Sequence, residues 1–173
     1  MPPVPEQAVT SAGGLLLVIA VLLPFVGVLI GIALRGVHAR RVALCTLPLG
    51  LAIAIAIAVT VLQSGAQLTY LLGGWAPPLG VALRADMAAV VMLVVVALVV
   101  CGIGIYACDD FNPARESPGS RASSTFWLLL LAVWGSLNLV FVSGDLFTLY
   151  VALELLTFAG VPLVCLDGRG DTL

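Results

Sequence analysis

The sequence contains no lysine and a single histidine, so its seven basic residues are all arginines. Only 9% of the 173 residues are charged, and the formal net charge is −2. Binding to the phosphates of nucleic acid depends on clustered lysine and arginine, and no such basic patch is available here. Nucleic acid is therefore excluded as a partner.

Residues that build catalytic or metal sites are also scarce. His38 is alone in a basic turn, and Gly102-Ile103-Gly104 lacks the third glycine and the strand context of a nucleotide-binding motif. The four cysteines form no Cys-X-X-Cys pair and have no neighbouring histidine, so we expect them to act as small residues in helix packing. They are Cys45, Cys101, Cys108 and Cys165. We expect no catalytic residue, no cofactor site and no metal site in this chain.

Apolar residues dominate what remains. The chain is 62% hydrophobic with a mean hydropathy of +1.22, which is more apolar surface than one small soluble core can bury. A membrane-spanning helix needs about 20 mostly apolar residues. Five stretches qualify, at residues 14–34, 42–62, 85–107, 126–142 and 146–166. The sequence therefore predicts an all-α integral membrane protein, with residues 1–173 forming a single membrane domain in the lipid bilayer.

The two long connections differ from these stretches in composition. Residues 63–84 are rich in glycine, proline and tryptophan and predict a structured loop or small hairpin, with Tyr70 and Trp75 at the membrane interface. Residues 108–125 have the composition of a solvated linker. The alternation over residues 52–57 would favour a strand in a soluble protein, but it lies inside an apolar run of spanning length, so we predict helix.

The arginines predict the orientation, because short loops rich in arginine stay on the cytoplasmic side. Six of the seven follow the first, third or fifth apolar stretch, and only Arg84 lies on the opposite side. The six are Arg35, Arg40, Arg41, Arg115, Arg121 and Arg169. We therefore expect an N-terminus outside, a cytoplasmic C-terminus, and the Gly/Pro/Trp-rich loop outside, in a multi-pass protein of the cell membrane, taken as a bacterial inner membrane.

Glu154 is the candidate functional residue. It lies nine positions after Asp145, so at about 1.5 Å per residue it falls close to the bilayer midplane. We therefore expect a deeply buried carboxylate that faces the bundle interior or a water path, because such residues usually mark ion or proton routes. Tyr150 and Thr157 share its helical face and predict a polar track, and Pro162 frees a backbone carbonyl one turn beyond. The alternatives are a protonated glutamate bonded across helices and a simple proline kink. The chain offers no cation at this depth, so either a functional partner comes from another polypeptide or Glu154 stays neutral.

Asp86 and Asp145 each precede an apolar stretch and are expected to cap the helix that follows. Arg84 is close enough in sequence to pair with either carboxylate at the surface. These three residues, with Pro162, are expected to have structural or interfacial roles.

Two segments resemble a known family. Residues 70–86, YLLGGWAPPLGVALRAD, and residues 143–163, SGDLFTLYVALELLTFAGVPL, resemble the N-terminal part of the proton-translocating antiporter-like subunits. These subunits occur in Mrp-type cation/proton antiporters, complex I and membrane-bound hydrogenases, and the first segment is most similar to the branch of Mrp D-type subunits. The resemblance implies that Glu154 corresponds to the fifth-helix glutamate that pairs with a seventh-helix lysine.

Family members resemble fourteen-helix proteins with inverted five-helix repeats, whereas this sequence stops just after the fifth stretch. The resemblance therefore implies a component of a complex that moves protons, with Na⁺ or K⁺ as the exchanged cation, completed by other membrane subunits. A membrane-arm subunit of an NADH:quinone oxidoreductase or hydrogenase, with the redox chemistry in other chains, is a second hypothesis. A truncated fragment that only packs helices is a third.

Overall fold

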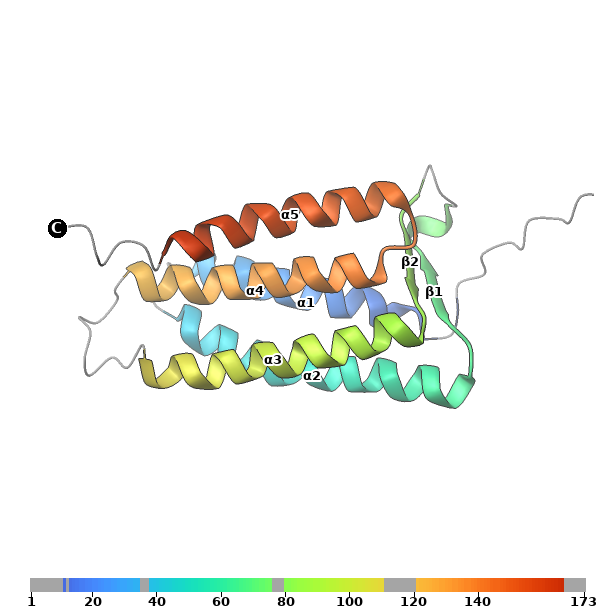
Figure 1. Ribbon diagram of the computed structural model, residues 1–173, viewed down its shortest axis with the longest axis horizontal. Coiled ribbons are helices and arrows are strands. Elements are labelled where there is room, and N and C mark those ends of the chain that lie inside the picture. Colours follow the sequence, from blue (N-terminus) through green and yellow to red (C-terminus); the bar gives the residue numbers. More distant parts are fainter. Residues whose placement is uncertain (1–10, 12, 35–37, 76–79, 111–120, 167–173) are drawn as a thin grey trace, which may run out of the picture.

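The computed structural model describes residues 11, 13–34, 38–75, 80–110 and 121–166. Five long helices run side by side along the molecule, and a small β-hairpin lies across one end (Figure 1). All five helices are long and apolar enough to cross a membrane, so the predicted multi-pass helical membrane protein is confirmed. They are α1 (Leu15–Ala33), α2 (Ala39–Ser64), α3 (Met87–Asp110), α4 (Arg121–Val142) and α5 (Leu146–Cys165).

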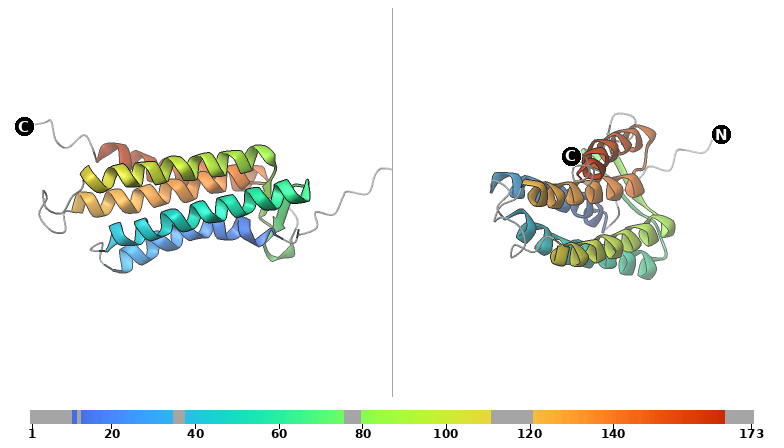
Figure 2. Two further views of the ribbon diagram at one scale, coloured as in Figure 1. Left: turned by 90° about the horizontal axis from the view of Figure 1, so that it is seen from below. Right: turned by 60° about the vertical axis from the view of Figure 1, so that its left-hand side comes forward.

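Helices α1 to α4 form a four-helix bundle, and α5 lies outside it. In the bundle α1 packs on α2, α2 on α3, α3 on α4, and α4 on α1. Helix α5 packs mainly against α4, and the views in Figure 2 place it on the outer side of that helix. Much of the surface of α5 is consequently left without a neighbour from the part of the chain that the structure describes.

The bundle core is built from large side chains of α4 set against small residues of its neighbours. Trp127 and Trp134 are fully buried. A Cβ at Gly50 of α2 would collide with the ring of Trp134, and a Cβ at Gly104 of α3 would collide with Leu47. Gly50 therefore lets α2 approach Trp134 of α4, and Gly104 lets α3 approach Leu47 of α2, as is common for small residues in membrane bundles.

The loop between α2 and α3 folds as the predicted hairpin. Strand β1 (Leu68–Leu71) pairs antiparallel with β2 (Ala82–Ala85), and the short 3₁₀ helix η1 (Leu72–Gly74) follows β1. Gly73 and Gly74 have φ angles of 71° and 74°, a conformation that favours glycine at both turn positions.

The hairpin ties together the helix ends on its side of the bundle. Ser11, ahead of α1, exchanges hydrogen bonds with the backbone of Thr69 in β1. On the other edge, Ser143 forms a β-bridge with Leu83, and the Gly144 N–H donates to the Ala82 carbonyl at 2.8 Å. Both edges of the hairpin are therefore engaged, one near α1 and one at the junction of α4 and α5.

The helices extend beyond the apolar stretches at several ends. Helix α2 includes residues 52–57 as predicted, and α4 begins at residue 121 rather than 126. Polar residues such as Ser123 and Thr125 continue the helix past the apolar run, which hydropathy alone cannot detect. The hairpin lies at one end of the bundle and Arg40 and Arg41 lie at the other; which end faces the cytoplasm stays a prediction.

Candidate functional site

Helix α5 has one buried stripe and a wide exposed face. Thr148, Ala152 and Ala159 are the buried residues and share one side of the helix. At about 100° per residue, Glu154 lies roughly 200° around the helix from Ala152, on the opposite side. The structure agrees, because Glu154 is exposed.

The five helices therefore do not bury Glu154, which corrects the interior placement expected from the sequence. The reason is the packing of α5, which has only α4 as its main neighbour and turns its small residues toward it. Around Glu154 the exposed face carries large side chains, with Tyr150 62% exposed and Phe158 84% exposed. In a membrane this face meets either lipid or another protein.

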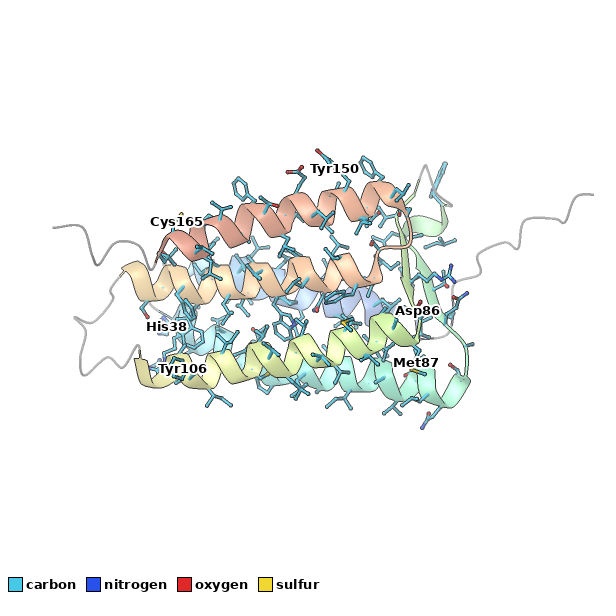
Figure 3. All side chains as sticks on the ribbon, viewed as in Figure 1. His38, Asp86, Met87, Tyr106, Tyr150 and Cys165 are labelled. Atoms are coloured by element: carbon cyan, nitrogen blue, oxygen red, sulfur yellow. The ribbon has the colours of Figure 1, made fainter. Side chains whose placement is uncertain are left out.

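The residues expected to form a polar track are on this same face. Tyr150 points away from the bundle (Figure 3), and Glu154 lies one turn further along the helix, near enough for its carboxylate to act on the tyrosine hydroxyl. Thr157 is also exposed, but its hydroxyl donates to the Leu153 carbonyl of its own helix at 2.9 Å. Tyr150 and Glu154 are thus neighbours on the exposed face, whereas the Thr157 hydroxyl is occupied by its own backbone.

Pro162 lies inside α5 and is exposed. Since proline has no N–H, the carbonyl of Phe158 loses its usual helical donor. This carbonyl is one turn beyond Glu154 along α5, and among the described residues no side chain donates to it.

Asp145 caps the N-terminus of α5 and fixes it to the hairpin. Its carboxylate accepts from the Thr148 N–H at 2.8 Å, from the Thr148 hydroxyl at 2.7 Å and from the Ala82 N–H at 3.4 Å. Partial burial disfavours the charged form, but these hydrogen bonds outweigh it and hold the pKa of Asp145 below its ordinary value. The link to Ala82 was not foreseen, because no local sequence pattern connects residues so far apart.

Asp86 and Arg84 lie just before α3, with Arg84 near the end of β2. Asp86 accepts a hydrogen bond from the Ala89 N–H at 2.8 Å, which is N-cap geometry. Arg84 is exposed on β2 and forms no ion pair within the described residues, so the expected pairing with Asp86 or Asp145 is not formed there. The carboxylate of Asp145 is instead taken up by N–H and O–H donors.

No group of three histidine, cysteine, aspartate or glutamate side chains that could hold a metal gathers within the described residues. The polar groups inside the bundle include instead single hydroxyl, thiol, amide and indole groups. Cys101 donates to the Leu47 carbonyl across α3 and α2 at 3.5 Å, and Asn138 donates to the Ala20 carbonyl across α4 and α1 at 2.9 Å.

Comparison with known proteins supports the resemblance. No protein-family model matches the chain. It is 33% identical over 120 residues to the D subunit of the Na⁺/H⁺ antiporter of Bacillus subtilis (strain 168), which is 69% of this chain and 23% of the relative. It is 32% identical over 108 residues to the N subunit of the NADH-quinone oxidoreductase of Desulforudis audaxviator (strain MP104C), 62% of this chain and 21% of the relative.

Two solved structures share the fold. The membrane-bound sulfane sulfur reductase, an archaeal respiratory membrane complex, matches with a TM-score of 0.74 and 21% identity, over 90% of this chain and 31% of the other. The Mrp complex from Dietzia sp. DQ12-45-1b matches with a TM-score of 0.66 and 23% identity, over 88% of this chain and 27% of the other.

The resemblance to antiporter-like subunits is thus confirmed, because the homologues are named as the D subunit of a Na⁺/H⁺ antiporter and the N subunit of an NADH-quinone oxidoreductase. The chain spans about a quarter or less of the length of these curated relatives. It is a multi-pass membrane component that is similar to one part of such subunits.

Proposed function

We propose that this chain is a membrane component of a proton-translocating cation/proton antiport complex, with Glu154 as the proton-coupling carboxylate and companion helices completing the site. The observation that carries the proposal is the placement of Glu154 on the outward face of α5, roughly 13 Å along the helix from its N-cap at Asp145.

An ionisable group at this depth needs a polar or charged neighbour. A carboxylate near the bilayer centre costs about 2.5–3.5 kcal/mol on insertion scales, and such residues almost always face a protein interior or a water path. Tyr150, one turn away on the same face, supplies a hydroxyl group but no positive charge. The chain has no lysine, and Arg40, Arg41 and Arg84, the arginines whose side chains the structure describes, lie at the ends of the bundle.

The missing cation therefore comes from another polypeptide, docked on the exposed face of α5. A cation beside Glu154 favours the charged carboxylate, while the low dielectric favours the neutral acid, and a balance between the two lets the group take up and release a proton. The site residues proposed are Glu154 with Tyr150, and Thr157 as a neighbour on the same face. The names of the antiporter relatives support Na⁺ as the exchanged cation, with K⁺ as the other candidate.

A second candidate is a membrane-arm subunit of a complex like NADH:quinone oxidoreductase. It is favoured by the relative from an NADH-quinone oxidoreductase and by the respiratory complex among the structural neighbours. In that case the chain carries no redox chemistry itself, and proton movement through Glu154 is driven by electron transfer in other subunits. The localisation proposed in both cases is a bacterial cell membrane.

The test is Glu154→Gln in the assembled complex, purified with its companion subunits and reconstituted into vesicles. We expect at least a tenfold loss of proton movement with unchanged assembly, because Gln keeps the shape and removes the proton-carrying group. Asp86→Asn is the matched control, since it removes a carboxylate from the hairpin end of the bundle. Exchange driven by an imposed Na⁺ or K⁺ gradient supports the antiporter, whereas dependence on electron donor and quinone supports the second candidate. Unchanged proton movement in Glu154→Gln would refute the role of this residue in both.

A further inference from the structure

Helix α1 contains a proline in its buried part. Pro24 is fully buried and has no N–H, so the carbonyl of Ala20, four residues earlier, loses its usual donor. Ala20 itself is 5% exposed, which leaves this carbonyl without access to solvent. An unpaired carbonyl in apolar surroundings is costly, and in a membrane bundle a neighbouring helix commonly supplies the missing donor.

Asn138 of α4 supplies that donor. Its Nδ2 donates to the Ala20 carbonyl at 2.9 Å, and the residue is 4% exposed. Its other polar atom, Oδ1, is buried and accepts from no group in the described part of the chain. The contact with a carbonyl fixes the orientation of the amide, because turning it over would set two acceptors against each other. The donor function of Asn138 is therefore the one that the fold uses.

Most other polar side chains inside the helices behave differently. They donate to the carbonyl four residues earlier in their own helix and so connect nothing; Thr46, Thr60, Ser136 and Thr157 do this. The Cys101 bond to Leu47 also crosses between helices, but a thiol is a weak donor. Arg40 of α2 also donates to the Cys108 carbonyl of α3, at 3.3 Å near the end of the bundle. The amide of Asn138 differs from both because it joins α4 to α1 and meets a carbonyl that a proline has freed.

We propose that Asn138 is a positioning residue that replaces the N–H missing at Pro24 and thereby fixes the height and rotation of α4 against α1. Helix α5 packs on α4, so the same contact sets the position of α5 and of Glu154 relative to the bundle. The inference goes beyond the proposed function and does not depend on it, since it concerns contacts within this chain and is measured without transport.

The test is a double-substitution cycle on the full chain, purified in mild detergent with any subunits that copurify. Asn138→Leu should lower the ratio of folded to unfolded protein roughly three- to twentyfold, the range measured for hydrogen bonds between membrane helices. Pro24→Ala restores an N–H to the Ala20 carbonyl from within α1. In the Pro24→Ala background, Asn138→Leu should lower the ratio of folded to unfolded protein less than twofold, because the Ala20 carbonyl no longer depends on the amide.

Two controls separate this role from packing. Pro48→Ala removes the proline of α2 and should not rescue Asn138→Leu, because Pro48 frees a carbonyl that Asn138 does not contact. Ser136→Ala removes another buried polar group of α4. It should lower the ratio of folded to unfolded protein slightly, and by the same factor with or without Pro24→Ala, because the Ser136 hydroxyl bonds within α4. Ordinary side-chain packing would not be rescued by one N–H on a different helix.

The proposal would be overturned if Asn138→Leu lowered the ratio of folded to unfolded protein by the same factor in the unsubstituted chain and in the Pro24→Ala chain. If Asn138→Leu fails to accumulate in the membrane by itself, accumulation replaces unfolding as the readout. The Pro24→Ala/Asn138→Leu double variant must then accumulate at the level of Pro24→Ala. Its failure to do so, with Pro24→Ala accumulating normally, would also overturn the proposal.

Discussion

Replacing Asp145 tests how α5 is held in place. Asp145→Ala removes the N-cap of α5, the bond from the buried Thr148 hydroxyl and the bond from the Ala82 N–H. Loss of an N-cap costs about 0.5–2 kcal/mol, and leaving a buried hydroxyl without its partner costs about 1–3 kcal/mol. Since these contacts share one carboxylate and are not additive, we expect Asp145→Ala to lower the free energy of unfolding by about 2–3 kcal/mol.

Asp86→Ala is the matched comparison. Asp86 is also an N-cap, but it is exposed and its side chain makes a single described hydrogen bond, to the Ala89 N–H. Its replacement should therefore cost about 1 kcal/mol or less. Both variants are measured by thermal or chemical unfolding of the purified chain in the same detergent. Equal losses for the two variants would refute the idea that Asp145 joins the hairpin to α5.

The pH dependence of Asp145 gives an independent check. Burial raises its pKa, and the hydrogen bonds from Thr148 and Ala82 lower it by more, so the folded value lies below the ordinary 3.8. A group whose pKa is lowered by folding stabilises the protein fully above its ordinary pKa, and this contribution is lost as the pH falls through the lowered value. Asp145→Asn, which keeps a capping side chain, should remove this part of the acid-induced loss of stability. An unchanged acid profile in Asp145→Asn would contradict the assignment.

Three further expectations concern topology, packing and completeness. Reporter fusions after Arg41 should be cytoplasmic and those at Gly74 external, because arginine-rich loops stay inside; one reversed reporter would overturn the orientation. Gly50→Ala should destabilise the fold by about 1–3 kcal/mol, since the new methyl collides with Trp134. Gly102→Ala, where a Cβ meets nothing within 4 Å, should be neutral or stabilise by up to about 1 kcal/mol; equal effects would refute the packing argument. The purified chain alone in liposomes should not exchange cations for protons, and antiport by it would contradict the need for a companion cation.

The local features of this chain could be predicted from its residues alone. Five apolar runs of spanning length had to become helices, because a backbone in lipid must satisfy its own hydrogen bonds. Asp86 and Asp145 could be assigned as caps from their position before an apolar run. Glu154, Tyr150 and Thr157 could be grouped on one face, because the period of a helix is a local property.

The direction in which that face points depends on how the helices pack. Apolar residues occur on every side of α5, so hydropathy does not distinguish the side toward α4 from the side left open; the packing of Ala152 and Ala159 on α4 does. The absence of an Arg84 ion pair within the described residues, the contact of Asp145 with Ala82, and the contact of Asn138 with Ala20 likewise join or separate residues distant in the sequence. Their partners are set by how whole helices and the hairpin pack in three dimensions, which no single segment specifies.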